Sequence, residues 1–151
     1  MIIGFTISLL AIGFDQLTKF LIYGKVAGSI IGNFLWFEST LNTGVAFSMF
    51  ENNSIVFFVL AIIASILLGY FVCSKKYFCL KIDKIALGLV LGGTLSNAID
   101  RLIFHGVRDF IYLKFMNFAI FNVADMAICI GAALICFSII FLRKDKKDDR
   151  T

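Results

Sequence analysis

The stretch Ile85–Phe104 reads IALGLVLGGTLSNAIDRLIF and combines a long apolar run with a polar end. A helix of about 20 residues rises about 30 Å, which is the thickness of the hydrocarbon core of a bilayer. Asn97 and Asp100 lie in its last turns, and the same Asn-x-x-Asp spacing returns at Asn122 and Asp125, in a second apolar stretch. An ionisable side chain within a membrane span is energetically costly and is usually functional. The sequence therefore predicts a membrane protein whose site is built from these two segments.

The composition supports this class. Hydrophobic residues make up 60% of the 151 residues, with 18 Phe and no Pro. This is more apolar than a soluble domain of that size needs. The net charge of +4 could suggest nucleic acid, but the basic residues cluster beside the apolar runs and form no groove interleaved with aromatic residues. We expect an integral membrane protein that binds membrane lipids and no nucleic acid.

Hydropathy predicts an all-α membrane protein with one domain, residues 1–151, and four transmembrane helices. Asp15–Lys19 follows the first apolar run and no basic residue precedes it, so we interpret this run as a retained helix and not as a cleaved signal peptide. No repeat or linker divides the chain, and nothing in the sequence requires an oligomer, so we expect a monomer. The four predicted spans are residues 2–23, 54–73, 85–104 and 121–142.

The distribution of basic residues predicts the orientation. Lys and Arg concentrate in the loop Ser74–Lys84 and in the tail after residue 142, and the positive-inside rule places both in the cytoplasm. Four spans then put both termini in the cytoplasm. The segments Gly24–Asn53 and His105–Ile120 face outward, and β-branched and aromatic residues between Ile30 and Leu41 predict short strands in the first of them.

In this topology the third helix runs outward and the fourth runs inward, so Asp100 and Asp125 come to the same depth, about 6 Å below the outer boundary. Gly88, Gly92 and Ser96 recur every four residues, which would allow the two helices to approach closely. We therefore expect the two helices to face each other through two polar stripes. These are Gly93, Asn97 and Asp100 on the third helix, and Asn122, Asp125 and Cys129 on the fourth.

Two facing carboxyl groups in a partly dry site cannot both ionise easily, so one keeps its proton while the other stays basic. The basic one can deprotonate a water that attacks an amide carbonyl, and the protonated one can donate to the carbonyl oxygen. Asp100 and Asp125 thus suggest aspartic proteolysis. Three alternatives remain open: carboxyl groups that only bond a neighbouring helix, a non-catalytic assembly factor, and a small proton-coupled transporter that uses the intramembrane carboxylates.

Two other acids have simpler interpretations. Asp15 and Lys19 are separated by four residues in the order that favours an intrahelical ion pair, so we expect them to be structural polar residues of the first helix. Asp109 could cap or turn the outer loop, and we assign it a supporting role at the site. A H-E-x-x-H zinc motif is absent, His105 is the single histidine and no C-x-x-C pair occurs, so we expect neither a metal nor a cofactor.

The chain resembles bacterial lipoprotein signal peptidase, also called signal peptidase II, over nearly its whole length. The resemblance rests on five short motifs that occur in the order typical of that family. They stand here as Asp15-Gln16-Leu17-Thr18-Lys19, Asn42-Thr43-Gly44-Val45-Ala46-Phe47, Gly92-Gly93 through Asn97 to Asp100-Arg101, Val107-Arg108-Asp109-Phe110, and Phe121-Asn122-Val123-Ala124-Asp125.

The resemblance implies an aspartic endopeptidase of the bacterial cytoplasmic (inner) membrane, with its active site near the extracytoplasmic face. Its substrates would be prolipoproteins, cut before a diacylglyceryl-modified cysteine. Asp100 and Asp125 would be the catalytic pair. The resemblance also implies a small extracytoplasmic β-cradle and a small helix, both formed by Gly24–Asn53.

The supporting residues follow from the same resemblance. Asn42 and Arg101 would hold the substrate backbone, while Asn97 and Asn122 would support the acids. Gly44, beside Asn42, would belong to the site too, although a turn alone would explain both residues.

Overall fold

The fold is described by a computed structural model, which covers residues 1–44, 53–74 and 76–142. Four of its helices are long and apolar enough to cross a membrane, as the sequence predicts. The third helix begins four residues before the predicted start, because the Asp83 carboxylate accepts a hydrogen bond from the Leu80 backbone N–H and caps the earlier turn. The helices are α1 (Ile2–Ile22), α2 (Ser54–Cys73), α3 (Lys81–Phe104) and α4 (Val123–Phe137), which continues as a π-helical segment, Ser138–Leu142.

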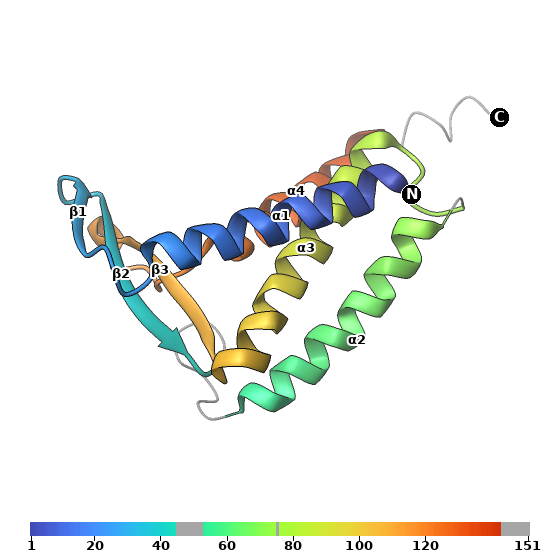
Figure 1. The fold of residues 1–151 in the computed structure, drawn as a ribbon. Coiled ribbons are helices and arrows are strands. Elements are labelled where there is room, and N and C mark those ends of the chain that lie inside the picture. The colour runs from blue at the N-terminus through green and yellow to red at the C-terminus, as the bar shows by residue number, and fades with distance from the viewer. Residues whose placement is uncertain (45–52, 75, 143–151) are drawn as a thin grey trace.

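A three-stranded antiparallel sheet lies at the end of the bundle where α1 and α3 end and α4 begins (Figure 1). It consists of β1 (Gly28–Ile31), β2 (Leu35–Asn42) and β3 (Val107–Leu113), in that order. The first two strands confirm the predicted strands and the small sheet. The third strand was not expected, because strands were predicted only within Gly24–Asn53 and this one lies between α3 and α4. The small helix expected within Gly24–Asn53 has no counterpart in the described part of that segment, and residues 45–52 lie outside the description.

Helix α3 is the centre of the bundle and packs against α1, α2 and α4. Contrary to expectation, Gly88 and Gly92 face α1 and not α4. A Cβ atom at Gly92 would lie 2.6 Å from the carbonyl oxygen of Ser8, so only glycine permits this approach. The close contact between α3 and α4 depends instead on Gly93 and Gly131.

The outer surfaces of the helices are apolar and open. Leu9 on α1 is 70% exposed and Ile55 on α2 is 73% exposed, which suits contact with lipid chains. The interior near the sheet is polar, and several of its polar side chains are at most 2% exposed. Buried polar groups of this kind require hydrogen-bond partners. The most enclosed of them are Asp15, Lys19, Ser96, Asp100, Asp109 and Asn122.

Candidate active site

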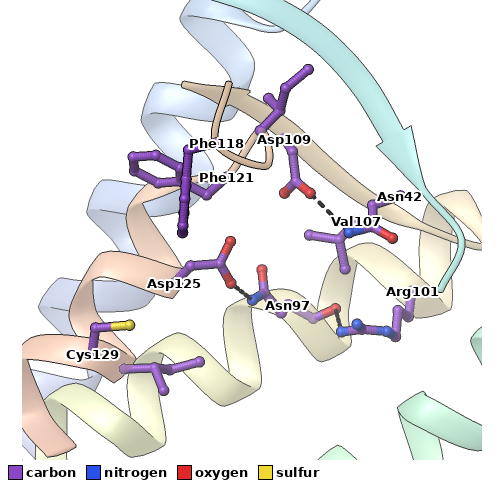
Figure 2. A pocket seen from close by; sticks show the side chains of 11 residues that line it. Asn42, Asn97, Arg101, Val107, Asp109, Phe118, Phe121, Asp125 and Cys129 are labelled. Atoms are coloured by element: carbon purple, nitrogen blue, oxygen red, sulfur yellow. Dashed lines mark hydrogen bonds between the residues drawn. The ribbon is translucent and has the colours of Figure 1, made fainter. Parts of the chain in front are cut away.

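A cavity of about 310 Å³ opens between α3, α4 and the strands β2 and β3 (Figure 2). Its polar wall carries two carboxyl groups, Asp109 from β3 and Asp125 from α4, which project toward the same space. Apolar side chains, among them Phe118 and Phe121, lie beside the two acids. The lining residues are Asn42, Asn97, Arg101, Val107, Asp109, Phe118, Ile120, Phe121, Asp125, Ile128 and Cys129.

Asp125 owes its position to the start of α4. Asn122 is the N-cap residue, and its side-chain oxygen accepts a hydrogen bond from the Asp125 backbone N–H at 3.0 Å. In return the Asp125 Oδ2 atom accepts from the Asn122 backbone N–H at 3.1 Å, which completes a capping box. The other oxygen, Oδ1, accepts from the Asn97 Nδ2 at 2.8 Å. The carboxyl group is thus held in the first turn of a helix, where the helix dipole favours a negative charge.

Asp109 reaches the cavity because alternate residues of a strand share a face, so Val107 and Asp109 line it together. Its side chain is 2% exposed. Asp109 Oδ1 accepts a hydrogen bond from the Asn122 Nδ2 at 2.6 Å, and Oδ2 accepts from the Asn42 Nδ2 at 3.1 Å. Neutral amides therefore satisfy both oxygens, and no ion pair is formed with Asp109 among the described residues.

The electrostatics of Asp109 follow from this setting. Burial in the site, and next the negative charge of Asp125, raise the pKa of Asp109 from 3.8 to about 7, against the opposing effect of its amide hydrogen bonds. The charge of one carboxyl group acts on the other because both line the same cavity. Asp109 is therefore an acid that can hold a proton at neutral pH.

Asp100 does not lie in the cavity, which corrects the expectation that it faces Asp125. Its Oδ1 accepts from Gln16 Nε2 at 2.9 Å and from Arg108 Nη2 at 2.8 Å. Its Oδ2 accepts from the Arg108 backbone N–H and Nε, and lies 3.1 Å from Lys19 Nζ. With two cations and five donors around it, this carboxylate has no free oxygen for a water or a substrate.

The reason is the rotation of α3. Residues advance about 100° each, so Asp100 falls about 60° short of a full turn from Asn97, on the side of α1. Arg101 passes the full turn by about 40° and lies on the cavity side. The stripes are thus confirmed at Gly93 and Asn97, which meet α4, but not at Asp100.

Asp100 belongs to a buried chain of alternating charges, Asp15, Lys19, Asp100 and Arg108. The expected ion pair between Asp15 and Lys19 is confirmed at 2.7 Å, with both side chains fully buried. Asp15 also ties α1 to two other helices, because it accepts from Ser96 Oγ at 2.6 Å and from the Ala124 backbone N–H at 2.8 Å. The four formal charges sum to zero, which makes their burial tolerable.

The remaining predicted residues fall in two places. Asn42 and Arg101 line the cavity, whereas Gly44 touches it indirectly, through a backbone oxygen 3.4 Å from Arg101 Nη2. The buried Nε of Arg101 has no hydrogen-bond partner among the described residues, so the guanidinium has a donor to spare. Cys129 lines the apolar end.

Sequence reasoning missed two polar residues and the aromatic wall. Gln16 and Arg108 complete the charge cluster, and Arg108 Nη2 also donates to Gln16 Oε1 at 2.8 Å. Their only signal was membership of the quoted motifs. Phe121 likewise stands in a quoted motif, whereas Phe118 carried no signal because Phe is common throughout the chain; both line the cavity.

Comparison with known proteins gives concordant results. The family model described as "Signal peptidase (SPase) II" matches residues 7–141. Two similar solved structures are described as bacterial membrane enzymes determined by the in meso method, at 2.3 Å and 1.9 Å resolution. The first is 34% identical, covers 96% of this chain and 90% of its own, and has a TM-score of 0.80. The second is 31% identical, covers 91% of this chain and 92% of its own, and has the same TM-score of 0.80.

Proposed function

Because the chain belongs to the signal peptidase II family, we propose that it is an aspartic endopeptidase that removes signal peptides from diacylglyceryl-modified prolipoproteins. The cut falls before the lipidated cysteine. The family establishes a membrane-embedded signal peptidase that processes lipoproteins. The aspartic mechanism and the lipid-modified substrate are the proposal. One observation carries the mechanism: Asp109 and Asp125 share one cavity, and neither forms an ion pair within the described part of the chain.

We assign the acid pair to Asp109 and Asp125, in place of Asp100 and Asp125. Asp100 is saturated by Lys19 and Arg108, so it is a poor base. Among the residues that the structure describes, Asp109 and Asp125 accept hydrogen bonds only from amide groups, which leaves lone pairs for a water between them. Since one chain supplies both acids, a monomer suffices for the reaction.

The two acids have different roles. The first turn of α4 favours a negative charge on Asp125, while burial and the neighbouring charge keep Asp109 protonated up to about pH 7. Asp125 takes a proton from a water molecule while the water oxygen attacks the scissile carbonyl carbon. At the same time Asp109 donates its proton to the carbonyl oxygen. When the tetrahedral intermediate collapses, Asp109 recovers that proton. Asp125 transfers the other proton to the leaving amine, and the C–N bond breaks.

The cavity matches a substrate with two characters. Arg101 and Asn42 present donors for peptide carbonyl oxygens beside the acids. Phe118, Ile128 and Cys129 form an apolar side that suits the hydrocarbon near a lipidated cysteine. We further propose that the enzyme lies in the cytoplasmic membrane of a bacterium, with this cavity near the extracytoplasmic face.

The test is cleavage of a synthetic precursor peptide by purified protein in detergent, without any ion gradient. Wild-type protein should cut the diacylglyceryl-modified precursor before the cysteine. It should leave the same peptide without the lipid intact or cut it far more slowly. The variants Asp109→Asn and Asp125→Asn should each lose cleavage by about 100-fold or more, the scale of a positioned acid or base. The double variant should be scarcely worse, because the pair acts as a unit.

Two results would contradict the proposal. Wild-type protein that is folded but does not cut without a gradient would favour the transporter alternative. Full cleavage by Asp109→Asn with loss in Asp100→Asn, at matched folded protein, would restore the pair that the sequence alone suggested.

A further inference from the structure

We infer that Lys19 is a positioning residue for the reaction, because it fixes the Asn97 amide in the orientation that donates to Asp125. This inference rests on the proposed function. Lys19 lies on α1, outside the cavity, and its side chain is fully buried. Its role in the charge cluster accounts for two of its three contacts, and the third contact leads to the acid pair.

The ammonium group of Lys19 has three N–H donors, and three acceptors surround it. Asp15 Oδ2 lies at 2.7 Å, Asp100 Oδ2 at 3.1 Å and Asn97 Oδ1 at 3.1 Å. The two carboxylates would suffice for a buried ion pair. The hydrogen bond from Lys19 to the Asn97 side chain on α3 therefore has a further role. That role follows from the partner of the Asn97 Nδ2 atom.

An asparagine side chain has an oxygen that accepts and a nitrogen that donates. An ammonium group cannot accept, so it selects the oxygen. With Asn97 Oδ1 facing Lys19, the Nδ2 atom must point the other way, where it donates to Asp125 Oδ1 at 2.8 Å. Asn122 Nδ2 also donates to Asn97 Oδ1, at 3.2 Å, but as a neutral donor shared with Asp109. Lys19 is thus the charged donor that fixes the orientation of the Asn97 amide.

The orientation of this amide matters for the protonation of Asp125. A donor at Oδ1 stabilises the carboxylate, whereas an amide turned by 180° would present an acceptor oxygen, to which only a protonated carboxyl group could donate. The charged groups that act on Asp125 are Lys19 and Asp15 from α1, Arg101 from α3 and Asp109 from β3. Lys19 favours the ionised form both through its charge and through Asn97. It therefore helps to keep Asp125 the base of the pair.

The experiment compares Lys19→Met with Lys84→Met, a matched control. Lys84 donates to three backbone carbonyl groups near the far end of α2, at 2.7–3.2 Å, and touches no part of the cavity. In Lys19→Met we expect kcat per folded molecule to fall at least about tenfold, a part of what a proton-transfer group contributes. The acidic limb of the kcat profile should move up by about one pH unit, as for loss of a nearby opposite charge. Lys84→Met should change neither.

A double-mutant cycle with Asn97→Leu tests whether the effect passes through the amide. If it does, Lys19→Met should lower kcat much less in the Asn97→Leu background than in the wild type. Equal fold-changes in both backgrounds would overturn the inference. So would an unchanged kcat and an unchanged acidic limb in folded Lys19→Met.

If Lys19→Met alone does not fold, the test uses the double variant Lys19→Met/Asp15→Asn and compares it with the single variant Asp15→Asn. That double variant retains Asp100 and Arg108 as a balanced pair. The same loss of kcat and the same shift of the limb are then expected, and their absence would overturn the inference. Failure of the proposed function itself is distinguishable, because it would appear as an inactive wild type or as an active Asp125→Asn.

Discussion

Asn122 and Asp109 meet at 2.6 Å, although one begins α4 and the other lies in the middle of β3. The same asparagine caps the helix that carries Asp125, so a single side chain fixes the relative position of both acids. Beside the backbone bridge between Ile111 and Phe121, this hydrogen bond is a second link between the strand and the start of the helix. This contact makes the cavity a defined site, and it underlies the predictions that follow.

Asp100→Asn should act on stability more than on turnover. The change leaves Lys19 and Arg108 buried with one carboxylate fewer between them, and breaking a buried ion pair commonly costs about 3–5 kcal/mol. We expect a clearly lower melting temperature in detergent, with kcat per folded molecule well above that of Asp109→Asn. Thermal melting and active-site-normalised turnover measure the two effects. A fully stable but inactive variant would contradict this prediction.

The activity should fall as the pH rises through about 7. The pKa of Asp109 is raised from 3.8 to about 7, so the proton that it donates is present below this value and is lost above it. The basic limb of the kcat profile with the lipidated precursor measures this loss. A basic limb above pH 9 would argue against Asp109 as the acid.

The same group links stability to pH. Between about pH 4 and pH 7 the folded protein binds the Asp109 proton and the unfolded chain does not, so the free energy of unfolding falls as the pH rises. Asp109→Asn should flatten that slope. Chemical unfolding in detergent at several pH values compares the two proteins, and identical slopes would contradict the shift.

Arg101→Lys should reduce kcat/KM about tenfold or more, the scale of one hydrogen bond to a charged group. Lysine keeps the charge but loses the planar set of donors, including the Nε that has no partner among the described residues. Lys114→Arg is the control, because Lys114 lies over the Trp36 ring and outside the cavity. If both variants had the kinetics of the wild type, Arg101 would not bind substrate, and its charge would serve only to orient the chain in the membrane.

The orientation can be measured by labelling. In a cysteine-free background, a cysteine placed near Lys25 or Lys114 should react with an impermeant maleimide from outside the cell, and one near Lys81 should not. The background is necessary because the native cysteines Cys73, Cys79, Cys129 and Cys136 are all exposed. Restoring Cys79 gives an internal control beside Lys81. Labelling in the reverse pattern would place the acids near the cytoplasm.

The sequence predicted the helices well because their signal is local. The run Ser54–Cys73 contains no charged residue, and its observed ends match the predicted ones. The strand Val107–Leu113 was missed because Arg108 and Asp109 interrupt its apolar pattern, and because it pairs with β2, which lies far away in sequence. Pairing across such a distance depends on tertiary structure that a single segment does not reveal.

The acids were harder for a related reason. Spacing along the sequence predicts how far along α3 Asp100 lies. Which neighbour its side chain meets depends also on where α1 packs, and the sequence does not specify that. Its partner Arg108 lies beyond the end of the helix, in a strand that was not predicted. Asp125 was easier to place, because Asn122 and Asp125 form a capping box within one turn.

The capping box at the start of α4 has a consequence for hydrophobic mismatch. Asp125 lies three residues from the point where the helix begins, and that point is attached to the sheet through Asn122 and Asp109. A change in bilayer thickness tilts helices or shifts their lipid-facing ends. Here α4 is attached to protein at the sheet and, near its other end, through the hydrogen bond from Ser138 to Asp83 of α3, so the helix keeps its place in the bundle. We therefore expect the spacing of the two acids to be insensitive to the chain length of the surrounding lipids.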